Sequence, residues 1–180
     1  MAVLHRATVQ PSKQELVEAW LDRQSWGGSG ELQTIGSYRF DDPQGAVGVE
    51  AILVRRQGRV LQVPMTYRGA PLAGADEHLM ATMDHSVLGM RWVYEAARDP
   101  VAVGCFSRAL AGQQEQATLD VYDGDVLVGE REPDVRVRRR FGSTAAARAL
   151  RIAEVLSERL DGFELLVATW SGGEAVVAVR

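Results

Sequence analysis

The chain has 180 residues, of which 46% are hydrophobic, with 20 basic residues against 24 acidic ones. A chain of this length can bury a sizeable core and is expected to form one domain, or one domain with two lobes. The net charge of -4 argues against a nucleic-acid-binding protein, which usually presents a basic surface. The single cysteine, Cys105, excludes an internal disulfide and a thiolate zinc cluster.

The N-terminus has no charged leader followed by an apolar run, and no apolar stretch reaches the ~20 residues that a membrane helix needs. These features predict a cytoplasmic protein with no membrane contact. The only lysine is Lys13, which indicates a GC-rich bacterial genome. No glycine-rich phosphate-binding motif is present either, so the sequence argues against a kinase active site.

The first half of the chain predicts one helix and several strands. Ser12 followed by Glu15 is typical of a helix N-terminus, and the apolar spacing after it predicts a helix over about 12–24. Pro64 cannot donate a hydrogen bond to a neighbouring strand, so its strand is expected to be bulged or at an edge there. The expected strands cover residues 3–9, 32–40, 47–54 and 60–67.

The second half predicts another helix and then more strands. Asp99 and Pro100 are typical of a helix start, and Gly112 is expected to end that helix. Residues 144–160 fit a helix, although a short strand over 150–156 is the alternative. The expected strands cover residues 117–122, 126–128, 135–141, 163–170 and 174–179. Helices and strands are clustered rather than alternating, which favours an α+β fold with a mostly antiparallel sheet.

Two groups of polar residues invite a chemical interpretation. His78 and His85 stand beside Glu77 and Asp84, a combination that can bind a metal ion, although a surface or hydrogen-bonding role is the favoured interpretation. A nucleophilic Cys105 paired with His85 is disfavoured, because a cysteine within an apolar helix usually acts as a small hydrophobe. No catalytic residue, metal ligand or cofactor is predicted.

An arginine run lies in the predicted strand 135–141. Arg136, Arg138 and Arg140 would share one face of that strand and could bind phosphate. Acidic residues lie immediately upstream, and charged edge strands deter aggregation, so a solvated or ion-paired edge is the favoured interpretation.

Three segments carry a resemblance to a known family. These are the string VLQVPMTYRGAPL at residues 60–72, WVYEA at 92–96 and DPV at 99–101. The segments resemble the N-terminal cap of bacterial maltokinases, and most of all the stand-alone cap-like proteins of that group. The resemblance covers roughly residues 1–110, and the opening strand and helix agree with it.

The resemblance implies an α+β cap, a curved and mostly antiparallel sheet with packed helices. The polar stretch 112–116 is the expected boundary between a cap-like region over 1–112 and a β-rich extension over 113–180, which is either separate or part of the same domain. The large catalytic lobe of a maltokinase is absent, and the strand lysine expected near the C-terminus is missing. No catalytic residue of the family is therefore carried over.

The resemblance implies a non-catalytic binding or regulatory module of maltose, trehalose or α-glucan metabolism that acts through a protein partner. Branching-enzyme activity is not expected, since it needs paired carboxylates on a large glucan-binding scaffold. The alternative is a small enzyme or a protein that binds a sugar or sugar phosphate, with a cleft near Arg68, Asp84 and His85.

The candidate surface or ligand site comprises Tyr67, Arg68, Asp84 and His85, and an enzyme would require such side chains to converge on one pocket. For Arg68, the alternative role is to pair with an acidic neighbour and fix the turn that follows.

Overall fold

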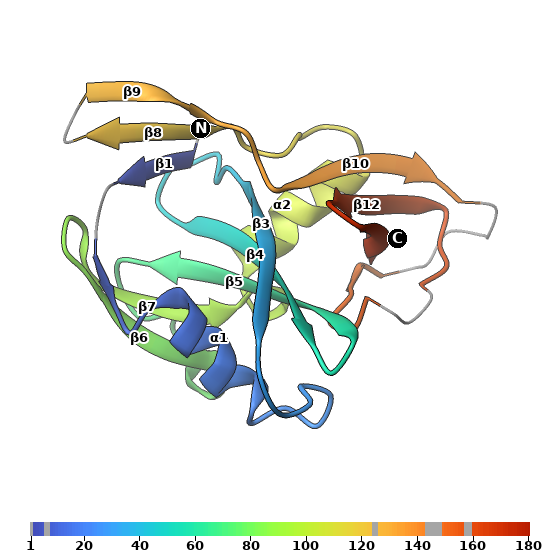
Figure 1. Cartoon of the computed structure of the whole chain (residues 1–180). Coiled ribbons are helices and arrows are strands. Elements are labelled where there is room, and N and C mark those ends of the chain that lie inside the picture. Colours follow the sequence, from blue (N-terminus) through green and yellow to red (C-terminus); the bar gives the residue numbers. More distant parts are fainter. Residues whose placement is uncertain (1, 6–7, 124–125, 143–148, 157–159) are drawn as a thin grey trace.

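The computed structural model describes residues 2–5, 8–123, 126–142, 149–156 and 160–180 (Figure 1). Its helices are α1 (Lys13–Leu21) and α2 (Pro100–Leu110), with short 3-10 turns η1 (Asp76–His78) and η2 (Ala96–Arg98). None of the helices in these ranges is long and apolar enough to cross a membrane. The strands are β1 (Ala2–His5), β2 (Val9–Gln10), β3 (Gln33–Phe40), β4 (Gly48–Arg56), β5 (Arg59–Arg68), β6 (Leu79–His85), β7 (Gly89–Glu95), β8 (Leu119–Asp123), β9 (Val126–Arg131), β10 (Val135–Phe141), β11 (Arg151–Ile152), β12 (Glu164–Trp170) and β13 (Gly173–Val179).

The largest sheet has six strands in the order β2-β6-β7-β5-β4-β3, and every neighbouring pair is antiparallel. It is strongly curled into a half-barrel, with α1 on one side and α2 on the other (Figure 1). The predicted α+β class with a curved, mostly antiparallel sheet is confirmed.

Both helices begin where the sequence predicts. Ser12 caps α1 through the N–H of Glu15, and the Glu15 carboxylate accepts in return from the N–H of Ser12. The helix ends at Leu21, three residues before the predicted end. Asp99 caps α2, Pro100 is its first residue, and Gly112 follows it with a φ of 72°, a left-handed conformation that favours glycine.

The remaining strands form two smaller sheets, with the orders β10-β12-β13-β11 and β1-β8-β9. The first is antiparallel, and it contains the predicted terminal hairpin of β12 and β13. The predicted strand over 3–9 is divided, because β1 runs parallel to β8 whereas β2 pairs with β6 in the large sheet. Within 144–160, β11 is a short strand, and residues 143–148 and 157–159 lie outside the described residues.

The large sheet and the C-terminal sheet share one core. Its buried side chains come from β3 and β4, from α2 and from the C-terminal strands, where Leu166, Ala168 and Val177 belong to it. Gln62 of β5 is fully buried between the two sheets: its amide nitrogen donates to the carbonyls of Ala153 and Val177, and its oxygen accepts from the Tyr38 hydroxyl. The proposed boundary at 112/113 therefore runs through a shared core.

Pro64 lies where no strand in the described ranges pairs with the side of β5 that faces away from β4. The N–H of Gln62 points away from β4 and donates to the carbonyl of Glu154, so the nitrogen of Pro64, two residues on, faces the same side. Pairing with β7 begins only at Met65. The strand is thus locally an edge at Pro64, as predicted.

Candidate functional site

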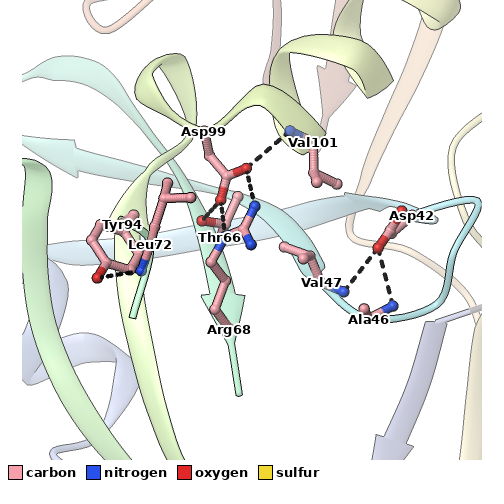
Figure 2. A network of polar contacts seen from close by, with 9 residues as sticks. All are labelled: Asp42, Ala46, Val47, Thr66, Arg68, Leu72, Tyr94, Asp99 and Val101. Atoms are coloured by element: carbon pink, nitrogen blue, oxygen red, sulfur yellow. Dashed lines mark hydrogen bonds and ion pairs between the residues drawn. The ribbon is translucent and has the colours of Figure 1, made fainter. Parts of the chain in front are cut away.

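Arg68, at the end of β5, is bound by the carboxylate of Asp99 at the start of α2 (Figure 2). The guanidinium donates from Nε to Oδ2 over 2.6 Å and from a terminal nitrogen to Oδ1 over 2.7 Å, so the pair is bidentate. Thr66 donates its hydroxyl to Oδ2 over 2.7 Å, and the N–H of Val101 donates to Oδ1 over 2.9 Å. One carboxylate thus joins the end of β5 to the first turn of α2.

Asp99 is inaccessible to solvent. Burial would raise the pKa of Asp99, but the hydrogen bonds from Arg68, Thr66 and the Val101 N–H outweigh it and lower that pKa. The carboxylate is therefore ionised and accepts four hydrogen bonds. It is neither a proton donor nor an open ligand, so the Arg68–Asp99 pair is a structural contact.

The turn that follows Arg68 is held independently. The N–H of Leu72 donates to the hydroxyl of Tyr94, which is buried on β7 (Figure 2). Arg68 thus pairs with an acidic neighbour, which was the alternative role predicted for it, while the Tyr94 hydroxyl holds the turn.

Tyr67 points to the opposite face of β5, where it contacts a second buried carboxylate, Glu50 of β4. The Tyr67 hydroxyl donates to Oε2 of Glu50 over 2.9 Å. Lys13 of α1 donates to the same oxygen over 2.6 Å, and Ser37 of β3 donates to Oε1 over 2.9 Å. The only lysine of the chain is therefore used to neutralise a carboxylate beneath the N-terminus of α1.

The Glu50 carboxylate is strongly stabilised in its charged form. Burial would raise the pKa of Glu50, but the charges of Lys13 and Arg39 and the hydrogen bonds from Lys13 and Tyr67 lower it to about 2. Burial and the adjacent Glu50 charge raise the pKa of the Tyr67 hydroxyl well above its ordinary value. Glu50 lines a cleft of about 240 Å³, but its oxygens already have three donors, so this cleft offers a fixed charge and no acid–base pair.

Asp84 and His85 lie at the end of β6, in the hairpin that joins β6 to β7. Nδ1 of His85 accepts hydrogen bonds from the N–H groups of Val87 and Leu88, so the imidazole closes its own turn. Asp84 is exposed and pairs in register with Gln10 and Met90. Both residues thus lie at the end of the strand next to the β2 edge of the sheet.

The four predicted residues form two neighbouring pairs rather than one cluster. Arg68 is in register with Trp92, and Trp92 with Thr82, so β7 separates Arg68 from β6, on which Asp84 and His85 lie further along. Arg68 is directed to Asp99, Tyr67 to Glu50, and His85 to its own turn. Each of these bonds leads to a residue outside the four.

The other histidine of the metal-site hypothesis, His78, lies 3.2 Å from the Glu95 carboxylate and 3.5 Å from that of Glu77. Among the described residues, no three His, Cys, Asp or Glu side chains are close enough together to hold a metal ion. Cys105 is buried in α2, and burial raises the pKa of its thiol, which makes it a weak nucleophile.

Two carboxylates that organise this region were missed as site residues. Glu50 carries a signal in the sequence, since it is the one charged residue in the otherwise apolar stretch 46–54. Asp99 was identified only as a helix cap, because its pairing with Arg68 depends on the path of the chain between them.

Residues 20–99 match the family model of the maltokinase N-terminal cap domain. The search of curated proteins and the search of solved structures returned no match. The match begins within α1 and ends at Asp99, the residue that binds Arg68 and caps α2. Residues 20–99 are thus similar to a maltokinase N-terminal cap domain.

Proposed function

We propose that this cap-like protein is a non-catalytic binding or regulatory module of maltose, trehalose or α-glucan metabolism that acts through a protein partner in the cytoplasm. The observation that carries the proposal is the match of residues 20–99 to the cap of a sugar kinase. A domain that accompanies a sugar kinase is a natural regulator of the enzymes that handle the same sugars.

The surroundings of Lys13 support a non-catalytic role. A kinase uses a lysine to pair the phosphates of the nucleotide. The only lysine of this chain lies 2.6 Å from a carboxylate that is 4% exposed, and moving it to a nucleotide would leave that charge buried and unpaired. Arginine supplies the other positive charges.

The alternative function, a small enzyme or sugar-phosphate-binding protein near Arg68, Asp84 and His85, has less support. Arg68 is bound to Asp99, and His85 accepts hydrogen bonds from the turn of its own hairpin. A ligand at this place would have to displace an intramolecular bidentate ion pair.

Affinity capture from a native bacterial lysate, with the full chain as bait, tests the proposal. We expect an enzyme that acts on maltose, trehalose or an α-glucan to be retained, to bind the purified chain saturably, and to change its rate on binding. Retention only of proteins unrelated to these sugars, or binding with no change in rate, would contradict the proposed role.

A thermal-shift panel separates the alternative from the proposal. Maltose, trehalose, maltose 1-phosphate and ATP with magnesium are added to the purified chain, since a ligand at ~100 times its Kd stabilises a protein by about 2.7 kcal/mol. We expect no shift from any of them. A saturable shift that is lost in Arg68→Lys would favour the ligand-binding alternative instead.

A further inference from the structure

The C-terminal sheet has an open edge at β10, which is first in the order β10-β12-β13-β11. Figure 1 shows β12 along one side of β10 and no strand along the other. Gln116 identifies the groups on the open side: its side-chain oxygen accepts from the N–H of Val137 and its nitrogen donates to the carbonyl of Val135. The Gln116 amide thus occupies the place of a neighbouring strand over one residue pair.

Beyond Gln116, no strand of the described residues pairs with this edge. Since N–H and C=O groups of alternate residues point to the same side of a strand, the carbonyl of Val137, both groups of Arg139 and the N–H of Phe141 face away from β12. Among the residues that the structure describes, none bonds these four groups. We call them the β10 edge, and they could pair with about three residues of an added strand.

The cleft beside this edge is positively charged. It has a volume of about 600 Å³, and its charged lining comprises four arginines, Arg131, Arg136, Arg138 and Arg139, against two glutamates, Glu115 and Glu132. Arg136 pairs with Glu132, and Arg139 with Glu164, but Arg138 is exposed and has no ion-pair partner in the described part of the chain. Nε of Arg139 is buried and also lacks a hydrogen-bond acceptor there.

An apolar contact lies at the far end of the edge. Phe141 is 61% exposed and Phe163 is 46% exposed, and their ring centroids are 5.4 Å apart. The guanidinium of Arg139 lies 4.3 Å from the centroid of the Phe141 ring. Exposed paired aromatics next to unpaired backbone groups form an anchor for a partner side chain.

We propose that the β10 edge is a docking site for an extended acidic segment of a partner protein, which adds to the sheet as a further strand. Backbone hydrogen bonds to Val137, Arg139 and Phe141 would hold the segment. An acidic side chain would pair with Arg138, and an apolar one would pack on Phe141 and Phe163. The proposal rests on the proposed function only in requiring a protein partner.

Charge decides between a foreign strand and a second copy of this chain. Antiparallel pairing of two β10 strands about their centres would place the two Arg138 side chains directly opposite each other, and like charges in that position are destabilising. Arginines on the edge thus oppose self-association and attract an acidic strand.

Selection from a displayed library of random dodecapeptides on the full chain tests the proposal. We expect the recovered peptides to be rich in glutamate or aspartate and in β-branched residues, and to slow hydrogen exchange at the amides of Arg139 and Phe141. Arg138→Glu should weaken the best peptide at least tenfold. The matched control, Arg55→Glu, reverses an exposed arginine on β4 and should leave binding unchanged.

Other outcomes overturn the docking site. Failure to recover acidic peptides, equal binding by Arg138→Glu, or unchanged exchange at Arg139 and Phe141 would each mean that the arginines only deter aggregation. A captured sugar-metabolising enzyme that binds Arg138→Glu normally would refute the β10 edge and leave the proposed function standing. If acidic peptides bind at the edge but the lysate yields only proteins unrelated to these sugars, the β10 edge would stand and the proposed function would be refuted.

Discussion

The half-barrel region and the C-terminal sheet differ in where their charged side chains lie. Glu50 on the half-barrel and Asp99 at the start of α2 are buried, and their oxygens accept hydrogen bonds from groups of the same chain. In the C-terminal sheet, the arginines of β10 are largely exposed, and the backbone beside them is open.

The two buried carboxylates lie in the segment that matches a family model, whereas the open strand edge lies outside that segment. Residues 20–99 contain both buried carboxylates, whereas β10 lies outside the match. The sequence predicts a site next to Arg68, but the Arg68 guanidinium already donates to both oxygens of Asp99. The backbone groups of the β10 edge belong to the extension, so partner specificity is expected to come from it.

The largest expected effect comes from separating the two parts. A fragment of residues 1–112 would lose the buried C-terminal side chains of the shared core, including Val135, Leu166 and Val177. Each fully buried aliphatic side chain contributes about 1.5–3 kcal/mol, so their sum is comparable to the ~5–15 kcal/mol that stabilises a domain. We expect no cooperative melting of the fragment by near-ultraviolet circular dichroism. A sharp, native-like transition would show that the cap-like region is an independent domain.

Next in size is the loss of the Arg68–Asp99 pair. Arg68→Ala would leave Asp99, with no solvent access, without its charged partner, and breaking a buried pair costs about 3–5 kcal/mol. Urea denaturation at pH 7 measures the change. The control is Arg108→Ala, which removes an arginine that bonds the Gln114 amide rather than a carboxylate and should cost much less. Equal losses in both variants would contradict a special role for the pair.

Local signals account for what the sequence predicted well. The capping box at Ser12 and the Asp99–Pro100 start act within a few residues, and the strand over 135–141 has its predicted bounds. Each of these elements is determined by its own stretch of chain.

Contacts between distant segments account for what was missed. Gln62 bonds Ala153 and Val177 across more than 90 residues, and Asp99 meets Arg68 only because β5 and α2 are adjacent in the fold. The same applies to the site: residue types suggest Tyr67, Arg68, Asp84 and His85, but only the strand order reveals that β7 lies between the first two residues and the last two. The open side of β10 likewise depends on strand order, which periodicity does not encode.

Acid should weaken the half-barrel through its carboxylates. The folded pKa of Glu50 is about 2 against an ordinary value of 4.5, so its stabilisation is present above pH 4.5 and is lost as the pH falls toward 2. The difference corresponds to about 3 kcal/mol. Asp99, whose pKa is also lowered, acts in the same direction.

Glu50→Gln isolates this contribution to acid sensitivity. Urea denaturation of the variant and the natural chain at pH 7, 5, 4 and 3 should show the stability difference between them shrinking as the pH falls. A difference that stays constant over this range would mean that Glu50 titrates normally in the folded protein.

The smallest expected effect on stability is that of Arg138→Glu, and it distinguishes the exposed arginine of β10 from Arg68. Arg138→Glu should change the free energy of unfolding by no more than about 0.5 kcal/mol, because the side chain is exposed and has no ion-pair partner within the described residues. The same substitution is expected to abolish most binding at the β10 edge. Stability and binding are thus expected to respond separately there, whereas Arg68→Ala is expected to reduce stability. Urea denaturation at pH 7 measures the free energy of unfolding of the variant. A loss above 1 kcal/mol would mean that Arg138, like Arg68, stabilises the fold. The β10 arginines would then be structural residues rather than residues that bind a partner.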